Sequence, residues 1–239
     1  MTTTLPPRRT PFVTLAAVAD LVTFGSSTRA AHLRAARARR LHAEASAHAA
    51  AELELMRASD TERLAVACSA PFRERVALEL AAAARDGRRA PLLQVVSLPG
   101  PVGRWRTALD HEFDVVDAAS AESFVQTRSA LAHSLADRSA SCATLLSAEC
   151  LHVATAAAGV GYWSREEALA TCTPLLDLVA RLHPSWDSFA AAFLAGEKSC
   201  GRPDDVRHIV FAQVVGRLLT DGRSPWAAVS WPTAESPGS

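Results

Sequence analysis

The side chains best suited to acid–base chemistry or metal binding gather in one short stretch, LDHEFDVVD. They are the carboxylates Asp110, Glu112, Asp114 and Asp117 and the imidazole of His111. Carboxylates and imidazole bind divalent cations and exchange protons with substrates. Acidic residues just before a helix more often stabilise its positively charged end. We therefore expect a solvated loop and a helix cap here, and we predict no metal ligand and no cofactor. If one region of the chain bound a divalent ion, it would be this one.

Covalent catalysis by cysteine needs a thiol beside a histidine. The nearest pair along the chain is Cys150 and His152, and two residues so spaced on a helix point in different directions. His183 and His208 are expected at helix ends or on an apolar face. The sequence also has no phosphate-binding glycine loop with its lysine, no G-x-S-x-G turn and no H-E-x-x-H helix. We predict no catalytic residue and favour a protein that is not an enzyme.

Five cysteines are scattered along the chain with neither C-x-x-C nor zinc-finger spacing: Cys68, Cys142, Cys150, Cys172 and Cys200. Such cysteines usually pack as small hydrophobic residues, and thiols stay reduced in the cytoplasm. The apolar run from Phe12 to Phe24 follows a double arginine, but Asp20 interrupts it and it is shorter than the ~20 residues that span a bilayer. We expect free thiols, a cytoplasmic location and no membrane span.

The composition is that of a packed protein, with 49% hydrophobic and 21% charged residues and a formal net charge of zero. Zero net charge implies no bulk attraction to nucleic acid. A local basic set does occur near the N-terminus: Arg29, Arg34, Arg37, Arg39 and Arg40. Most of its members share one side of an alanine-rich helix without aromatic stackers. We interpret them as a solvated face, and nucleic acid is not an expected partner.

The first hundred residues are expected to be helical beyond a loose arm at 1–11. Helices are predicted over 12–24 and 28–57, then from Asp60, and again from Pro71 at a helix start. The stretch 90–103 is short, apolar and bounded by proline and glycine, which indicates a strand or a linker. We place the main boundary there, between an N-terminal helical extension over 1–100 and a helical domain over 101–239.

The second half shows clear helix punctuation. Asp117 or Ser120 begins one helix, and Gly159 and Gly161 end the next. Ser164 with Glu167 matches a capping box, in which side chain and backbone satisfy each other. The stretch SWDSFAAAFLAGEKSC then has an apolar stripe at helical spacing, and its lone glycine lets a neighbouring helix approach closely. A last long helix starts at 203–205 with these residues predicted to point inward: Val206, Ile209, Val210, Val214, Leu218 and Leu219.

The segments GYWSREEALATCTPLLDLVARLHPSWDSFAAAFLAG and LLTDGRSPWAAVSW carry a family pattern. Over about 105–231 the chain resembles the bacterial domain-of-unknown-function 1266 family. The motif residues are Gly161, Tyr162, Ser164, Glu167, Ser185, Trp186, Gly196, Ser224, Pro225, Trp226 and Trp231. The chain departs from the pattern at Glu197, where the family usually has arginine, and in TLLSAECLHVATAAAG, which lacks the family's Trp-Asp and Arg.

The resemblance implies an all-helical domain without an established activity. We expect a compact multi-helix bundle in which large aromatic residues pin the C-terminal tail. The leading hypothesis is a non-enzymatic cytoplasmic protein that acts through contact with a protein partner, as a regulatory or immunity-type protein. The alternative is an enzyme or a helical domain that binds a small ligand or metal, with a site assembled from distant helices. Its candidate groups are the acidic stretch 110–117 and the imidazoles of His152 and His208.

Overall fold

The computed structural model describes residues 57–83, 102–200 and 205–232, together with the helical residues 32–33, 35–36 and 38–39. It divides the chain into two compact units, Met1–Ala50 and Ala51–Ser239. The helices predicted at 12–24 and over most of 28–57, and most of the stretch 90–103, lie outside the described residues. In the first unit, Leu33 is a helical side chain with 64% of its surface exposed.

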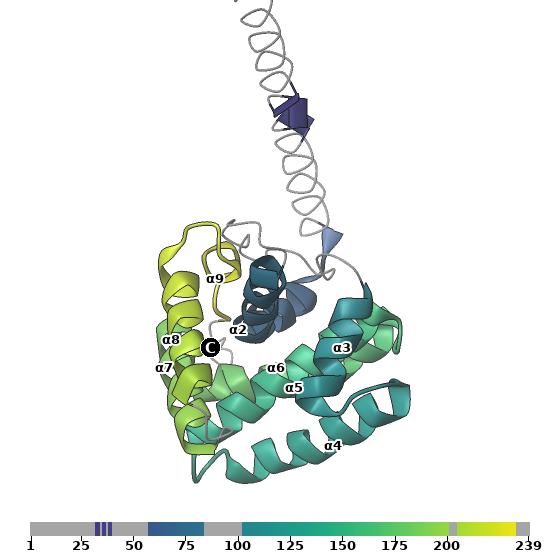
Figure 1. The fold of residues 1–239 in the computed structure, drawn as a ribbon. Helices are drawn as coiled ribbons and strands as arrows, with labels where there is room; N and C mark the ends of the chain where they lie inside the picture. The colour runs from purple at the N-terminus through teal and green to yellow at the C-terminus, as the bar shows by residue number, and fades with distance from the viewer. Residues whose placement is uncertain are drawn as a thin grey trace, which may run out of the picture. The chain divides into compact units, whose positions relative to one another are not determined.

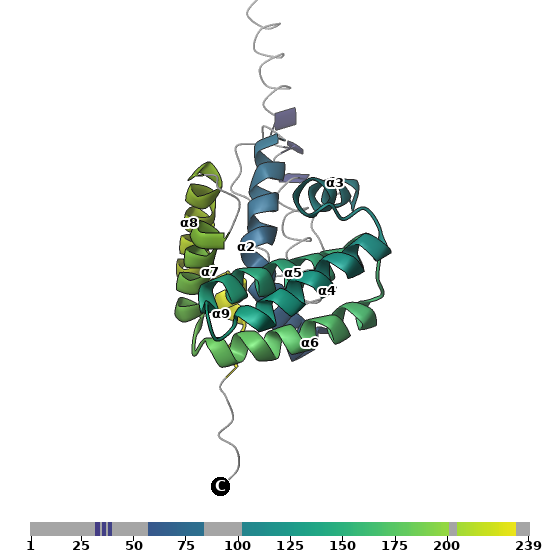
Figure 2. The ribbon, with the colours of Figure 1, turned by 90° about the horizontal axis from the view of Figure 1, so that it is seen from below.

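The second unit is built from helices, and the described ranges contain no strand. The elements are α2 (Asp60–Ala83), α3 (Val102–Phe113), α4 (Ala118–Leu135), α5 (Ala140–Val160), α6 (Arg165–Leu182), α7 (Trp186–Cys200), α8 (Asp205–Thr220) and α9 (Pro225–Ala228). This arrangement confirms the all-helical prediction. Figures 1 and 2 show α4, α5 and α6 running beside one another, with α7 and α8 at one end of this layer and α3 toward the other.

Helix α5 is the centre of the unit. It contacts α2, α3, α4, α6 and α7, and nearly every side chain from Cys142 to Ala157 is buried. Among the described helices it alone is long and apolar enough to cross a membrane, but 89% of its apolar window is buried within the protein. The hydrophobicity of α5 is therefore accounted for by the other helices that surround it.

Local hydrogen bonds set the helix boundaries as the sequence predicts. Asp117 caps α4 and forms a reciprocal capping box with Ser120. The Ser164–Glu167 capping box at the start of α6 is also present, with the Ser164 amide donating to Glu167 Oε2 over 2.7 Å. Gly161 ends α5 in the left-handed conformation at φ +81°, which glycine adopts without a Cβ penalty. Gly159, predicted to end the same helix, lies inside it.

Helix α2 corrects two expectations. It is one continuous helix with Pro71 inside it, whereas the sequence predicts a new helix start at that proline. It also belongs to the second unit, so the structure divides the chain near residue 50 and not near 100. The reason is tertiary: the fully buried ring of Phe72 lies 5.6 Å from that of Phe193 and 5.2 Å from that of Phe211.

The prediction of five free thiols is also wrong for one pair. Cys142 and Cys200 form a disulfide between the first turn of α5 and the last residue of α7, with their Cα atoms 5.9 Å apart. This separation is within the usual range for disulfides. Cys68, Cys150 and Cys172 are free and buried, as predicted. The pair escapes sequence reasoning because 58 residues separate its members.

The close approach of α5 and α7 depends on Gly196. A Cβ atom built on this glycine would lie 2.2 Å from the carbonyl oxygen of Ser141, which confirms that the glycine is needed for close packing. A Gly196→Ala substitution must push the two backbones apart, and overpacking of this kind costs about 1–3 kcal/mol. We expect a loss of that size in the free energy of unfolding, measured by urea denaturation.

The matched control for this experiment is Gly216→Ala in α8. A Cβ atom at Gly216 would meet no heavy atom within 4 Å, and alanine is favoured over glycine in helices by about 1 kcal/mol. The control should therefore be neutral or stabilising. Equal losses for both substitutions would contradict the proposed contact.

Candidate functional site

Two carboxylates of the acidic stretch 110–117 make structural interactions, while Asp110, His111 and Asp114 are exposed. Glu112 forms an ion pair with Arg75 of α2, and Asp117 caps α4. Hydrogen bonds from the Ser120 amide and hydroxyl lower the pKa of the Asp117 carboxyl. Asp114 lies in the turn after α3, at φ 55°. Within the part of the chain that the structure describes, no three histidine, cysteine or acidic side chains are grouped so that they could hold a metal ion.

His152 and Cys150 point into different parts of the core. The imidazole of His152 is stacked on Phe72 with ring centroids 5.4 Å apart, whereas the Cys150 thiol donates weakly to the Val125 carbonyl over 3.8 Å. Burial lowers the pKa of His152 well below its ordinary value of 6.5, and the charges of Arg73 and Arg75 lower it further. The structure does not bring thiol and imidazole together as a catalytic pair.

His183 is the C-terminal cap of α6 and connects three helices. Its Nε2 atom lies 2.6 Å from Thr144 Oγ1 in α5, and its Nδ1 atom lies 3.1 Å from Ser188 Oγ in α7. Burial lowers the pKa of this imidazole as well. The backbone carbonyl of His183 accepts the indole N–H of Trp231 over 2.8 Å. This histidine therefore acts as a neutral junction between helices.

Glu197 is buried and bonds to α8. Its side chain is 1% exposed, with Oε2 2.8 Å from His208 Nδ1 and Oε1 3.3 Å from Arg207 Nε. A carboxylate at this position supplies the negative charge that the partly buried Arg207 needs. The His208 imidazole, a candidate group of the ligand-binding hypothesis, is thus held in the α7–α8 contact.

Three tryptophans hold the C-terminal tail, as predicted. Trp186 and Trp226 are stacked with ring centroids 5.2 Å apart, and Trp231 lies edge-on to Trp186 at 4.6 Å. Each indole N–H donates to a backbone carbonyl: Trp186 to Val229 over 2.8 Å, Trp226 to Ala67 over 2.7 Å and Trp231 to His183. Buried indole groups need such acceptors.

The acceptor for Trp226 exists because of Pro71. In an α-helix the carbonyl of residue 67 normally accepts the N–H of residue 71, and proline has none. The missing helical donor leaves the Ala67 carbonyl available in a buried part of α2. The indole of Trp226, 159 positions later, takes the place of that donor. A helix defect in α2 thereby becomes the attachment point of the tail.

The remaining motif residues shape the ends of helices. Ser224 caps α9, accepting from the Ala227 amide and donating to the Leu218 carbonyl over 2.6 Å, and Pro225 is the buried first residue of that helix. Ser185 accepts from the Ser188 amide over 3.3 Å at the start of α7. The guanidinium carbon of Arg106 lies over the Tyr162 ring, 5.4 Å from the centroid of that ring.

Residues 147–231 match the model of one protein family, described as "Protein of unknown function (DUF1266)". This segment is a DUF1266 domain. The match begins inside α5 and ends at Trp231, so it includes most of the core helix, α6–α9 and the three tail tryptophans. No curated protein and no solved structure matches the chain.

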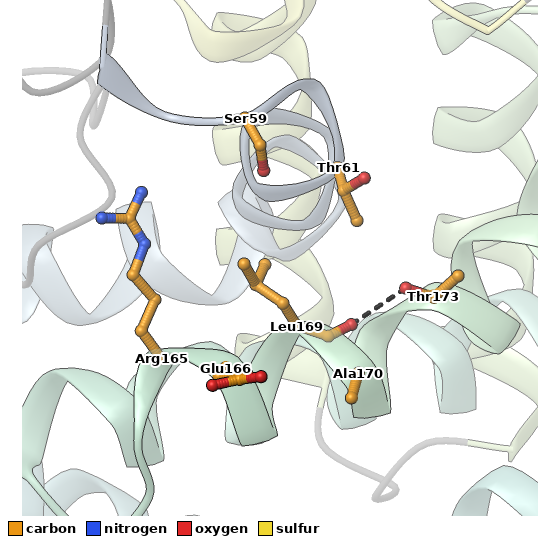
Figure 3. A pocket seen from close by; sticks show the side chains of 7 residues that line it. All are labelled: Ser59, Thr61, Arg165, Glu166, Leu169, Ala170 and Thr173. Atoms are coloured by element: carbon orange, nitrogen blue, oxygen red, sulfur yellow. Dashed lines mark hydrogen bonds between the residues drawn. The ribbon is translucent and has the colours of Figure 1, made fainter.

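Two shallow hollows flank α6 of the DUF1266 domain. The first, of about 490 Å³, lies between the start of α2 and α6 (Figure 3), and its lining residues are Ser59, Thr61, Arg165, Glu166, Leu169, Ala170 and Thr173. The second, of about 370 Å³, lies between α4 and α6 beside Trp163. Arg165 in the first hollow forms an ion pair with the buried Glu62, and Thr173 donates to the Leu169 carbonyl. The ion pair joins α6 to α2, whereas the Thr173 hydrogen bond lies within α6.

Helix α8 of the DUF1266 domain carries an exposed apolar surface that the sequence does not predict. Val214 and Leu218 are buried as expected, but Val206, Ile209 and Leu219 are 68%, 56% and 42% exposed. The expectation that these three point inward is wrong. Helical spacing identifies an apolar stripe, whereas the width of the stripe that is covered depends on the neighbouring helices.

The Trp226 hydrogen bond can be tested with a double-mutant cycle. Trp226→Phe should destabilise the protein more when residue 71 is proline, because the Ala67 carbonyl then loses its donor while buried. In the Pro71→Ala background the helix supplies that donor again. We expect the cost of Trp226→Phe, measured by urea denaturation, to be smaller by about 1–3 kcal/mol in this background. Equal costs in both backgrounds would show that the indole contributes only packing.

The lowered pKa of His152 predicts how stability depends on pH. The unfolded chain takes up a proton near the ordinary value of 6.5, while the folded protein keeps this imidazole neutral. The free energy of unfolding should therefore be unaffected above pH 6.5 and fall below it, by about 1.4 kcal/mol per pH unit for this one group, until the folded-state pKa is reached. The check is urea denaturation between pH 7.5 and about 5.

The control for the pH experiment is His152→Leu, which removes the titrating ring from its apolar site. Its stability should decline less steeply below pH 6.5, by the slope of one proton. His183 remains in both proteins and contributes equally. Identical slopes in the two proteins would contradict a neutral, buried His152.

Proposed function

We propose that the DUF1266 domain is a protein-interaction module whose contact surface is the exposed side of α8. We define the α8 outer face as Ile209, Ala212, Gln213, Gly216, Leu219 and Thr220. All six residues are exposed and none is charged. This face is the observation that carries the proposal, because exposed apolar side chains grouped on one element mark interaction surfaces.

Between Val206 and Thr220, the basic side chains of α8 make contacts with other helices. They are Arg207, His208 and Arg217. The first two contact Glu197 of α7, and Arg217 Nη1 lies 2.7 Å from the fully buried Glu74 of α2. The ion pairs anchor the inner side of α8 to two other helices. The α8 outer face is therefore uncharged, and α8 is fixed in position by its ion pairs with α2 and α7.

The chemistry of the face defines the partner. Small residues at its centre, Ala212 and Gly216, leave room for a backbone to approach, and open space surrounds Gly216. Apolar side chains stand at both ends, at Ile209 and Leu219. Eleven residues of helix span about 16 Å, or three turns. We propose that the occupant is a helix of another protein with an uncharged apolar face of matching length, since a charged partner would lose solvation without gaining an opposite charge.

The experiment is site-specific crosslinking of the full chain in its native cells. A photo-reactive phenylalanine analogue replaces Gln213 in the middle of the face, and in a second protein it replaces Leu131, which is 47% exposed on α4. We expect a crosslinked protein from position 213 alone. Mapping the crosslinked peptide should place it on an amphipathic helix with a neutral apolar side.

A charged substitution tests the same contact. Ile209→Arg should reduce the crosslink by at least about tenfold, because burying an unpaired charge in the contact costs well over 1.4 kcal/mol. Leu131→Arg is the matched control and should leave it unchanged. A crosslink to a second copy, to another segment of the same chain or to a charged segment would overturn the proposed partner. So would the absence of any crosslink specific to position 213.

A further inference from the structure

The disulfide Cys142–Cys200 joins two chemically different environments. Cys142 lies at the start of α5 and is 8% exposed, whereas Cys200 is the exposed last residue of α7. Thiol–disulfide exchange requires in-line access of a thiolate to one of the two sulfurs. An incoming thiol therefore reaches the Sγ atom of Cys200. The fold decides which sulfur is attacked.

The position of Cys142 in α5 makes its sulfur a good leaving group. Ser139 caps the helix and accepts the Cys142 amide over 3.4 Å, so Cys142 is the third residue of a 21-residue helix. The aligned peptide dipoles at a helix N-terminus stabilise a thiolate. A thiol that ionises more readily leaves a disulfide faster. Accessibility and leaving-group stability thus both favour attack on Cys200.

We infer that the Cys142–Cys200 pair is a redox-active thiol-exchange site, modified at Cys200 by a small thiol of the glutathione class. The attacking thiolate forms a bond to Cys200 Sγ, the bond between the two cysteine sulfurs breaks, and Cys142 departs with the electron pair as a thiolate. A second thiol molecule then attacks the mixed disulfide. It releases Cys200 as a thiolate, and the two thiols become one small-molecule disulfide.

The exchange is confined to this pair. Burial raises the pKa of the Cys172 thiol to about 12, and it raises the pKa of Cys68 and Cys150 further. A thiol that stays protonated and inside the core is a poor nucleophile and is not accessible to an oxidant. These three cysteines therefore serve as unreactive references within the same molecule.

Opening the disulfide would act on the contact that supports α8. Gly196, against the Ser141 backbone, and Glu197, which binds Arg207 and His208, lie within one helical turn of Cys200. The reduced protein loses the covalent closure of a 58-residue loop beside these contacts. We expect its melting temperature to fall by roughly 5–15 °C, as for other long-loop disulfides in chains of this size.

The site of attack is tested by mass spectrometry of the oxidised full chain. The protein is incubated briefly with reduced glutathione near pH 7, quenched with acid and mapped by peptide. We expect the mixed disulfide on Cys200, and none on Cys68, Cys150 or Cys172. A mixed disulfide found mainly on Cys142 would overturn the inference. So would five free thiols in the protein after treatment with oxidised glutathione.

The leaving-group argument is tested by alkylation of the reduced chain. The rate of reaction of each cysteine with iodoacetamide is followed by peptide mapping across pH, first in the wild type and then in Cys142→Ser and Cys200→Ser. We expect the midpoint for Cys142, at the helix N-terminus, to lie below that for Cys200. Coincident midpoints would overturn the inference, and the wild-type data decide the question even where a variant does not fold. This result is independent of whether α8 binds a partner.

Discussion

A buried backbone carbonyl in α2 attaches the C-terminal tail of the DUF1266 domain to the rest of its unit. Pro71 removes the helical donor of Ala67, and the Trp226 indole donates instead over 2.7 Å. The ring of Trp226 is then stacked on Trp186 of α7, and Trp231 packs edge-on against Trp186. The side chain that replaces the missing N–H donor is thus part of a cluster of three tryptophans. The path of the chain after α8 follows from satisfying that carbonyl.

The two sides of α8 differ in charge: the inner side forms ion pairs, and the outer side is the proposed interaction surface. The carboxylates of Glu74 and Glu197 are buried at 0% and 1% exposure and bind the arginines of α8 from inside. Burying such a pair costs desolvation free energy. Removing one partner destabilises the fold more, because the other charge stays buried without a counter-charge. The pairs therefore fix the position of α8. The opposite side of the helix then carries no charge. The proposed interaction surface and the buried ion pairs are two sides of one helix.

The residues that we predicted to form the family motif mainly end helices or allow helices to pack closely. Gly161 permits a left-handed helix end, Ser164 and Glu167 satisfy free amides, and Gly196 allows α5 and α7 to touch. The disulfide adds a covalent connection at the last of these contacts. The thiol exchange that we propose for this disulfide depends on its position, because one sulfur lies at a helix N-terminus and the other at the surface.

The sequence by itself determined the helices and their ends, because capping boxes such as Ser164–Glu167 and the spacing of apolar residues act over a few positions. It also determined the family and the role of the tail tryptophans. Tertiary structure alone decided that Ile209 is exposed, that Pro71 lies inside a helix and that Cys142 meets Cys200. The disulfide and the path of α2 depend on residues 58 or more positions away. The exposure of Ile209 depends on how much of the apolar stripe of α8 is covered by neighbouring helices. Periodicity identifies an apolar face, but only packing decides which part of that face is removed from water.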